Sequence, residues 1–301
     1  MELTILGCHS ATPRIDTHPT AQVLNIKNHL FLIDCGEGTQ VLLRKYKIKF
    51  SRIKHIFISH LHGDHFFGLV GLISTFRLLS READLNIYGP KGIKEIITLQ
   101  MKLADSWTNY GLYFHELSSK QSDLIYEDEK VEVHTIPLDH RIYTNGFLFK
   151  EKLSERKLDI IKAQKANIDK AYFPKLKQGF DVENESGEWI KNETVTLEGP
   201  PAKSYAFCSD TAYNQNIIPL IENVTALYHE STFLEKHHHL TQTTKHSTAK
   251  QAARIAKEAK VGKLILGHYS SRYKDLEDFK REAGAEFEHV ELAKSGKTFS
   301  I

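Results

Sequence analysis

The feature that most constrains this chain is a run of three histidines and one aspartate in six residues, His60-Leu61-His62-Gly63-Asp64-His65. The apolar segment 55–60 leads into this run and predicts a strand, and the apolar spacing of residues 69–79 after it predicts a helix. Side chains at the carboxyl end of a strand lie where α/β proteins bind ligands. Neutral imidazoles and a carboxylate are groups that Zn²⁺, Mn²⁺ and iron accept. The run therefore predicts a metal site, and a chance polar turn is the alternative.

Composition limits the class of protein. The chain has 301 residues, of which 41% are hydrophobic and 26% are charged, which is typical of a globular protein with one large domain or two small ones. No apolar run approaches the ~20 residues that a membrane span needs, and the start of the chain does not resemble a signal peptide. Three cysteines suit a reducing compartment. We expect a cytoplasmic protein without membrane partners, and exclude secreted and disulfide-scaffold classes.

Short apolar runs alternate with helical patterns along the chain, which indicates an α/β layered architecture. Strands are predicted at 3–6, 30–34, 55–60, 85–89, 131–138, 145–150, 204–210, 225–231, 263–268 and 297–301. Helices are predicted at 69–79, 93–103, 248–259 and 276–283. Residues 246–248 offer N-cap candidates for the third of these helices.

One segment departs from this alternation. Residues 150–178 hold nine Lys or Arg against four acids, whereas residues 181–198 hold six acids against one lysine. Neither block has a strong core-forming periodicity. The opposite charges cancel, so the net charge of +2 conceals them. We interpret 150–200 as an insertion outside the core that ends at Gly199-Pro200-Pro201. A solvated helical hairpin without a binding role is the alternative.

Further motifs appear in a fixed order after the histidine run. They are Asp34-Cys35-Gly36-Glu37-Gly38, Pro137-Leu138-Asp139-His140, Phe207-Cys208-Ser209-Asp210-Thr211 and Leu264-Ile265-Leu266-Gly267-His268. With these motifs the chain resembles the metallo-β-lactamase-fold hydrolases. It resembles the ribonuclease Z family of tRNA 3′-processing endonucleases more closely, through His229-Glu230-Ser231-Thr232-Phe233, His246-Ser247-Thr248 and His268-Tyr269-Ser270-Ser271-Arg272-Tyr273. The resemblance implies one domain over 1–301, a four-layer αββα sandwich with a flexible arm inserted at about 150–200.

The resemblance also implies a site for two Zn²⁺ per subunit, with Mn²⁺ or another divalent metal as a substitute. The implied ligands are His60, His62 and His140 for one ion, Asp64, His65 and His268 for the other, and Asp210 as a bridge. Asp34 is expected to support the histidine loop from behind rather than to bind metal. Taken singly, His140 or His268 would be read as an ordinary histidine at the end of a strand.

The activity implied is that of a zinc-dependent endoribonuclease, which removes the 3′ trailer from precursor tRNA by phosphodiester hydrolysis and leaves a 3′-OH on the tRNA. Asp64 would orient or deprotonate the nucleophile as well as bind metal. His246 would donate a proton to the leaving 3′ oxygen, with Glu230 orienting its ring. Arg272 and Ser270 would contact phosphate, through a planar fork of donors and a hydroxyl.

Recognition of the tRNA body is expected from the inserted arm. Its basic block would neutralise phosphates, and Lys175 and Lys177 belong to what resembles the end of the family's tip motif. The resemblance implies that the arm acts across the subunits of a homodimer. Two departures are visible. The Gly-Pro pair usual before the tip is replaced by residues 170–173, and residues 10–20 lack the Pro-x-Lys-x-Arg-Asn loop of many relatives. We expect weaker discrimination against tRNA ends that already carry CCA.

Two other interpretations remain open from the sequence. The same metal site serves phosphodiesterases or esterases that act on small molecules, and such an enzyme would keep its activity without residues 150–200. A non-catalytic tRNA-binding subunit of the same fold would lack metal ligands. All the expected ligands are present here, which favours an enzyme.

Overall fold

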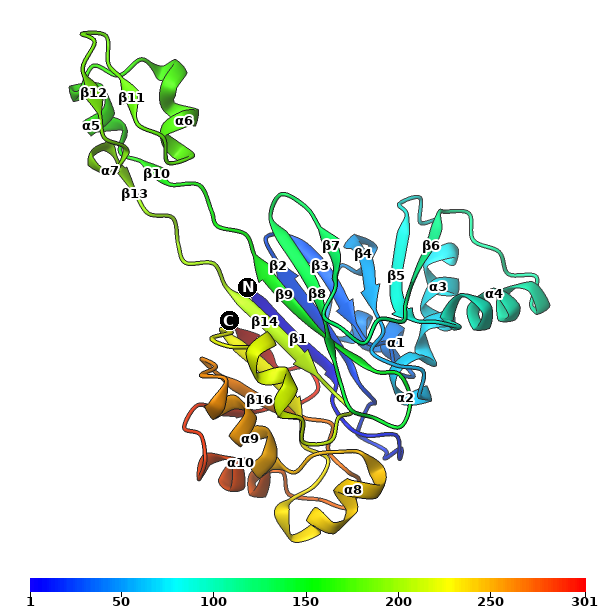
Figure 1. Cartoon of the computed structure of the whole chain (residues 1–301). Coiled ribbons are helices and arrows are strands. Elements are labelled where there is room, and N and C mark those ends of the chain that lie inside the picture. The colour runs from blue at the N-terminus through cyan, green and yellow to red at the C-terminus, as the bar shows by residue number, and fades with distance from the viewer. The chain divides into compact units, whose positions relative to one another are not determined.

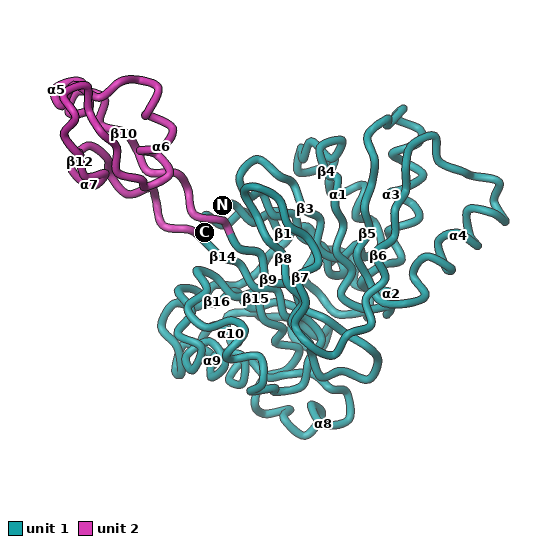
Figure 2. The backbone as a smooth tube through the Cα atoms, turned by 45° about the horizontal axis from the view of Figure 1, so that its top comes forward, with its two compact units in different colours: residues 1–150, 203–301 teal, residues 151–202 magenta.

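The computed structural model describes all residues from Met1 to Ile301 and divides into two compact units, 1–150 with 203–301, and 151–202 (Figure 2). The larger unit contains two seven-stranded sheets. The first has the order β18-β1-β2-β3-β4-β5-β6, with β1 (Glu2–Gly7), β2 (Ala21–Ile26), β3 (His29–Ile33), β4 (Ile53–Phe57), β5 (Leu85–Pro90), β6 (Leu112–Leu117) and β18 (Thr298–Ser300). The second has the order β17-β16-β15-β14-β9-β8-β7, with β7 (Leu124–Glu127), β8 (Val131–Pro137), β9 (Asn145–Glu151), β14 (Ser204–Cys208), β15 (Ala226–Glu230), β16 (Leu264–Gly267) and β17 (Val290–Leu292).

Aromatic side chains join the two sheets. The rings of Phe31 and Phe149 lie 5.5 Å apart between their centroids, and those of Phe57 and Phe147 lie 5.4 Å apart. All four are completely buried. Replacing one buried phenylalanine by alanine typically costs about 3–5 kcal/mol, so each of these rings is important for holding the two sheets together.

Helices cover the outer face of each sheet (Figure 1). The helices on the first sheet are α1 (Thr39–Lys45), α2 (Gly63–Phe66), α3 (Gly68–Leu78) and α4 (Ile93–Leu103), and those on the second are α9 (Ala249–Glu258) and α10 (Glu277–Gly284). The short elements between them are η1 (Phe50–Arg52), η3 (Gln215–Leu220), η4 (Glu235–Leu240) and α8 (Thr241–Thr244). The four-layer αββα sandwich expected from the sequence is thus confirmed.

The parallel strands place the loops that matter for function. Strands β3, β4, β5 and β6 run parallel, as do β14, β15, β16 and β17, so in each set the carboxyl ends meet at one edge. Asp34, Asp210 and His268 lie just after such strands with φ of 55°, 58° and 58°. A left-handed backbone costs an L-residue roughly 1–2 kcal/mol. Residues with such strained backbones are found most often at functional sites, where the surrounding structure holds their side chains in place.

Most predicted elements are present. Helix α4 has the predicted bounds, and α9 has Thr248 as its N-cap, whose hydroxyl accepts from the amide of Gln251 at 3.1 Å in a capping box. The strand predicted at 55–60 ends at Phe57, because the amide of Ser59 turns to the Asp34 carboxylate at 2.7 Å. In the larger unit, the sequence patterns missed the helices α1, α2 and α8 and the strands β2, β6, β7 and β17. Of these, β6 and β7 are half-exposed edge strands without a continuous apolar run.

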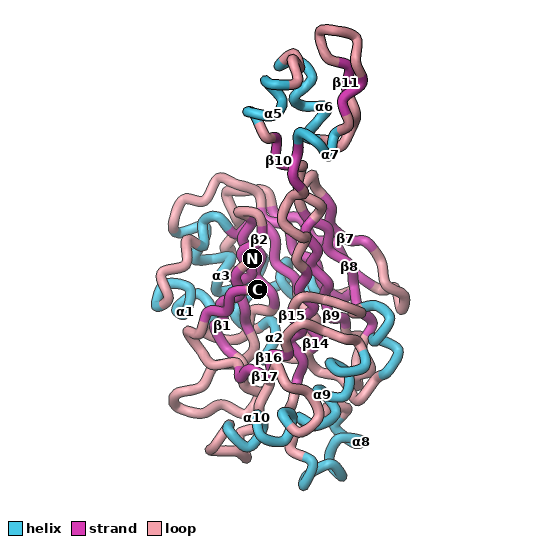
Figure 3. Tube along the Cα trace, turned by 90° about the vertical axis from the view of Figure 1, so that its left-hand side faces the viewer, coloured by secondary structure: helices cyan, strands magenta, loops and turns pink.

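Residues 151–202 form a compact unit of their own with helices and strands (Figure 3). Its elements are β10 (Lys157–Leu158), α5 (Ile160–Lys165), η2 (Lys170–Tyr172), α6 (Phe173–Lys177), β11 (Val182–Glu183), β12 (Trp189–Ile190), α7 (Asn192–Val195) and β13 (Thr196–Leu197). A small core holds them together, made of Ala163, Ile168, Leu176, Val182 and Val195. The alternative of a helical hairpin is therefore wrong.

None of the helices in the structure is both long and apolar enough to pass through a membrane.

Candidate metal centre

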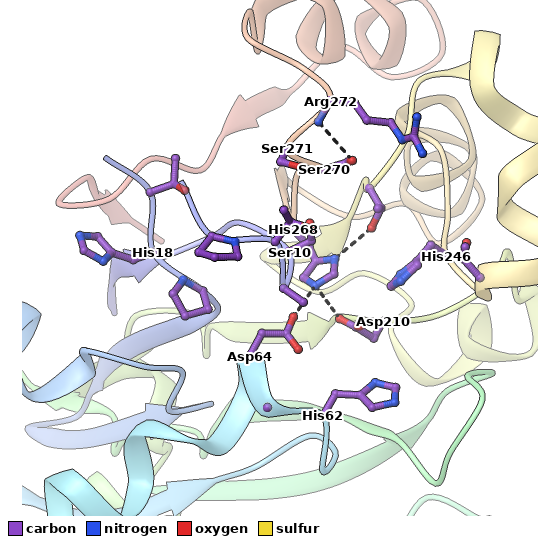
Figure 4. Close-up of a pocket in the computed structure, with 18 of the residues that line it drawn as sticks. Ser10, His18, His62, Asp64, Asp210, His246, His268, Ser270, Ser271 and Arg272 are labelled. Atoms are coloured by element: carbon purple, nitrogen blue, oxygen red, sulfur yellow. Dashed lines mark hydrogen bonds and ion pairs between the residues drawn. The ribbon is translucent and has the colours of Figure 1, made fainter. Parts of the chain in front are cut away.

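Seven side chains from both sheets bring their donor atoms together in two groups. The first group is His60, His62, His140 and Asp210, and the second is Asp64, His65 and His268; within each group the donor atoms lie within 4.8 Å of one another. The histidine run supplies four of the seven from the loop after β4 and from α2, and the others follow β8, β14 and β16. His62, Asp64, Asp210 and His268 line a cavity of about 760 Å³ (Figure 4). The structure thus brings together every residue expected as a ligand.

Hydrogen bonds fix the ring orientation of His65 and His140. The Nδ1–H of His65 donates to Asp34 Oδ2 at 2.7 Å, and that of His140 donates to the carbonyl oxygen of Lys245 at 3.0 Å. A carboxylate and a carbonyl only accept, so both rings carry their proton on Nδ1. In the neutral form of each ring, Nε2 is then bare and faces the other donors, which is the orientation that metal-binding histidines show.

His60 and His268 are oriented through hydroxyl groups. The hydroxyl of Ser59 donates to Asp34 Oδ2 at 2.9 Å and accepts from His60 Nδ1 at 3.0 Å. In the same way, the hydroxyl of Thr232 donates to a buried carboxylate at 2.6 Å and accepts from His268 Nδ1 at 2.9 Å. Because each hydroxyl has only one proton to give, the histidines must be the donors. Their Nε2 atoms are therefore also free of protons.

The inward-facing atoms fit a cation. His62 Nδ1 lies 3.0 Å from His60 Nε2 and 3.2 Å from His140 Nε2. His65 Nε2 is buried without a hydrogen-bond partner and lies 3.1 Å from Asp210 Oδ1. At these distances either a shared proton or a cation must lie between the facing atoms, since two lone pairs would repel. Nitrogen and carboxylate oxygen donors in this number suit a divalent transition metal.

The electrostatics of most donors favour the protonation states that a metal requires. Burial lowers the pKa of His60 and of His140, so both rings are neutral at pH 7. Burial alone would raise the pKa of Asp64 and Asp210, but the neighbouring histidines outweigh it and hold both pKa values below the usual range. Neutral imidazoles and ionised carboxylates are the forms that bind metal. His65 differs, because burial lowers its pKa but the charges of three nearby carboxylates, Asp210 foremost, outweigh it and hold that pKa well above the usual value, so a metal bound there would displace a proton.

Beside the two groups lies a close pair, Glu230 and His246. His246 Nδ1 is 2.7 Å from Glu230 Oε1, and the completely buried carboxylate also accepts from the amides of Thr211 and Ser247 at 2.8 and 3.1 Å. Burial lowers the pKa of His246, but the Glu230 charge and hydrogen bond outweigh it and raise that pKa to about 9. The ring lines the cavity (Figure 4), so it can hold a proton next to the metal donors.

The remaining expected residues divide between the two units. Ser270 and Arg272 line the cavity, Ser270 buried and Arg272 exposed. Lys175 and Lys177 are exposed on α6 of the smaller unit and do not line this cavity. Arg141 was missed by the sequence patterns, although it lines the cavity and directly follows His140.

Two positioning residues were also missed, Ser59 and Thr232. Both adjoin predicted site residues in the sequence, Ser59 just before the histidine run and Thr232 within the His229–Phe233 motif. That adjacency is the only sequence signal for them, because the imidazole that Thr232 orients is His268, 36 residues further along the chain.

Comparison with known proteins extends over the whole chain. Residues 1–172 match the family model described as "Anti-Pycsar protein Apyc1", which places the chain in the family that this model describes. Ribonuclease Z of Bacteroides fragilis is 45% identical over 302 residues, covering 100% of this chain and 99% of that protein. Ribonuclease Z of Cytophaga hutchinsonii is 46% identical and covers 100% of this chain and 96% of that protein. The ribonuclease Z matches therefore include residues 173–301, which carry Asp210, His246 and His268.

Solved structures give the same relationship. The short form of human tRNase Z superposes with a TM-score of 0.73 at 26% identity, covering 100% of this chain and 99% of that one. The metallo-β-lactamase-fold protein YhfI of Bacillus subtilis superposes with a TM-score of 0.69 at 17% identity, a likeness in fold alone. With the fold, the donor cluster and full-length relatives at 45% identity in agreement, the chain belongs to the ribonuclease Z family and is a metal-dependent endoribonuclease with the metallo-β-lactamase fold.

Proposed function

We propose that this chain removes the 3′ trailer from precursor tRNA with two zinc ions, by hydrolysing one phosphodiester bond and leaving a 3′-OH on the tRNA. The observation that carries the proposal is the convergence of seven metal donors in two adjacent groups at one cavity. The Glu230–His246 pair and Arg272 adjoin the same cavity. The ribonuclease Z relatives support tRNA as the substrate.

The two groups of donors would each hold one ion. His60, His62 and His140 would hold the first, Asp64, His65 and His268 the second, and Asp210 would contact both because its Oδ2 lies 3.6 Å from His60 Nε2 and its Oδ1 lies 3.2 Å from His268 Nε2. When bound, such ions supply positive charge for the phosphate oxygens and make water acidic enough to attack at neutral pH.

Three side chains of the protein then handle protons. Asp64 lies at the cavity wall and is ionised, so its carboxylate accepts a hydrogen bond from the attacking water and orients it or takes its proton. His246 lies at the same cavity and donates a proton to the 3′ oxygen that leaves with the tRNA. The Glu230 carboxylate accepts a hydrogen bond from His246 Nδ1, which keeps one proton of the ring on that atom. Its negative charge stabilises the protonated imidazole. A positioned acid of this kind is worth roughly 10²–10⁴ in rate.

Phosphate recognition is divided between the units. Arg272 and Ser270 would contact phosphates at the cut. Lys175, Lys177 and the other basic residues of 150–178 would contact the tRNA body, supplied by the partner subunit of a homodimer. The support for this arm is that 151–202 forms a compact unit with its own core and exposed lysines. Residues 10–13 line the cavity without the relatives' basic loop, which supports weak discrimination against CCA ends.

The test is cleavage of a 3′-extended precursor tRNA by the purified protein. Zinc or manganese should support a single cut near the discriminator base, a chelator should abolish it, and restored metal should return it. The products should be a tRNA with a 3′-OH and a trailer with a 5′-phosphate. A cut elsewhere, or no cut with either metal, contradicts the proposal. A variant without 151–202 should lose tRNA cleavage but retain hydrolysis of a small phosphodiester, because the metal donors lie outside the deleted unit.

A further inference from the structure

A second cavity, of about 540 Å³, adjoins the metal centre. Thr17 and His18 line both cavities, so the N-terminal loop forms a wall that the two share. The rest of the second cavity is formed by the end of α1, the segment 273–277 and the segment 292–297. It contains none of the metal donors. A chain that leaves the metal centre and crosses this loop at Thr17 and His18 would reach the second cavity.

The lining carries a small net positive charge, with five basic groups against three carboxylates that are themselves in no ion pair of the structure. Its lysines and arginine are Arg14, Lys45, Lys274, Lys294 and Lys297, and its carboxylates are Asp16, Asp275 and Glu277. Lys297 bonds to Glu291 at 2.8 Å, whereas the ammonium groups of Lys45, Lys274 and Lys294 are in no ion pair of the structure. Exposed ammonium groups without a carboxylate partner are free to bind phosphate.

An aromatic ring lies in the same lining. Tyr46 is half-buried, and its ring packs on Gly296, where a Cβ would lie only 2.6 Å from the ring carbon Cε1. The ammonium of Lys45 lies 5.6 Å from the centre of the ring. The Nδ1 atom of His9, also in this lining, is buried without a hydrogen-bond partner. A fixed aromatic ring beside positive charge is the arrangement that binds single-stranded nucleic acid by stacking.

The position of the second cavity indicates which part of the precursor RNA it would bind. Figure 4 shows His18 and His246 on opposite sides of Asp64 and Asp210. In the proposed function, His246 protonates the oxygen that leaves with the tRNA, so the tRNA end lies on its side of the centre. The RNA beyond the cut then lies toward His18. We propose that the second cavity binds the first nucleotides of the single-stranded 3′ trailer, with its lysines on the phosphates and Tyr46 beneath a base.

This trailer pocket rests on the proposed function, and its test separates the two. The variant Lys274→Ala/Lys294→Ala removes two exposed charges from the pocket. The matched control Lys102→Ala/Lys257→Ala removes two exposed charges from α4 and α9, outside both cavities. Each protein is assayed on one precursor tRNA with a trailer of a single nucleotide and with a trailer of about ten nucleotides, which exceeds the shortest binding sites for single strands.

The pocket variant should lose roughly tenfold in kcat/KM on the long trailer and stay within about twofold of wild type on the short one. Its salt dependence on the long trailer should be shallower by about 1.4 in log–log slope, since each phosphate contact to a single strand contributes about 0.7. Tyr46→Ala should weaken binding of a 5′-phosphorylated RNA of about ten nucleotides, measured by fluorescence anisotropy. The control should match wild type in every assay.

Two results would overturn the trailer pocket. Equal losses on both trailers would assign these lysines to the tRNA body, and unchanged rates on both would show that no trailer phosphate meets them. The absence of any cleavage by the wild-type protein is a different result, because it refutes the proposed function itself. Thermal unfolding of each variant, compared with wild type, identifies a loss that comes from folding.

Discussion

The hydroxyl of Thr232 connects the two halves of the proposed chemistry. It donates to Glu230 Oε2 at 2.6 Å and accepts from His268 Nδ1 at 2.9 Å, and its residue is 4% exposed. Glu230 in turn bonds to His246. The substitution Thr232→Val keeps the shape of the side chain and removes only the hydroxyl. It therefore separates the positioning role of this oxygen from packing.

The cost follows from the two bonds that are lost. A hydrogen bond to a charged group contributes about 1.5–3 kcal/mol and a neutral one about 1 kcal/mol, and the His268 N–H would be left buried without an acceptor. We expect the free energy of unfolding to fall by about 2–4 kcal/mol. Loss of a group that orients a metal-binding histidine typically lowers metal affinity 10–100-fold, so one metal should bind more weakly by that factor.

The assay is zinc affinity by competition with a chromophoric chelator, together with kcat/KM for precursor tRNA at a series of free zinc concentrations. Thr232→Val should need 10–100-fold more zinc for half-maximal activity, and activity at saturating zinc should recover in large part. Thr232→Ser restores the hydroxyl and should restore the affinity. If Thr232→Val bound both metals as tightly as wild type, the assignment of His268 as a ligand oriented by Thr232 would be refuted.

Further predictions concern the charged groups of the site. Asp64→Ala should abolish turnover and leave binding of tRNA in a gel-shift assay largely intact; lost binding would show that the carboxylate mainly builds the fold. His246→Asn should lower kcat by roughly 10²–10⁴ with little change in KM, and an unchanged kcat would exclude His246 as the acid. The pKa of His246 is raised from 6.5 to about 9 in the fold. In the chelator-treated protein, the pairing of His246 with Glu230 therefore adds at most about 3 kcal/mol to the free energy of unfolding. The whole of this contribution is present below pH 6.5. This stability is lost as the pH rises through about 9, which urea unfolding at low and high pH would measure, and Glu230→Gln should remove most of the difference.

The sequence predicted well what depends on neighbours in the chain. The histidine run, the helix over Ile93–Leu103 and the cap at Thr248 are local patterns, and the structure contains them. His60 and Asp210 lie close together only because the two sheets pack against each other. Local sequence patterns did not predict this contact, whereas the family resemblance implied it.

Other features had little or no usable signal. The core of 151–202 is built from single apolar residues such as Ala163 and Leu176, separated by polar ones, so only a modest periodicity at 158–168 pointed to it. The contact of Ser59 with Asp34 joins residues 25 positions apart, and nothing in either local sequence specifies it.

The spread of the donors along the chain has a consequence for biosynthesis. Four of them are synthesised between His60 and His65, but Asp210 and His268 follow strands of the second sheet that are made much later. A nascent chain that ends before β16 holds an incomplete set of donors, however well its first sheet has folded. With the proposed ligands, we expect hydrolytic activity only after the late strands have joined the early ones.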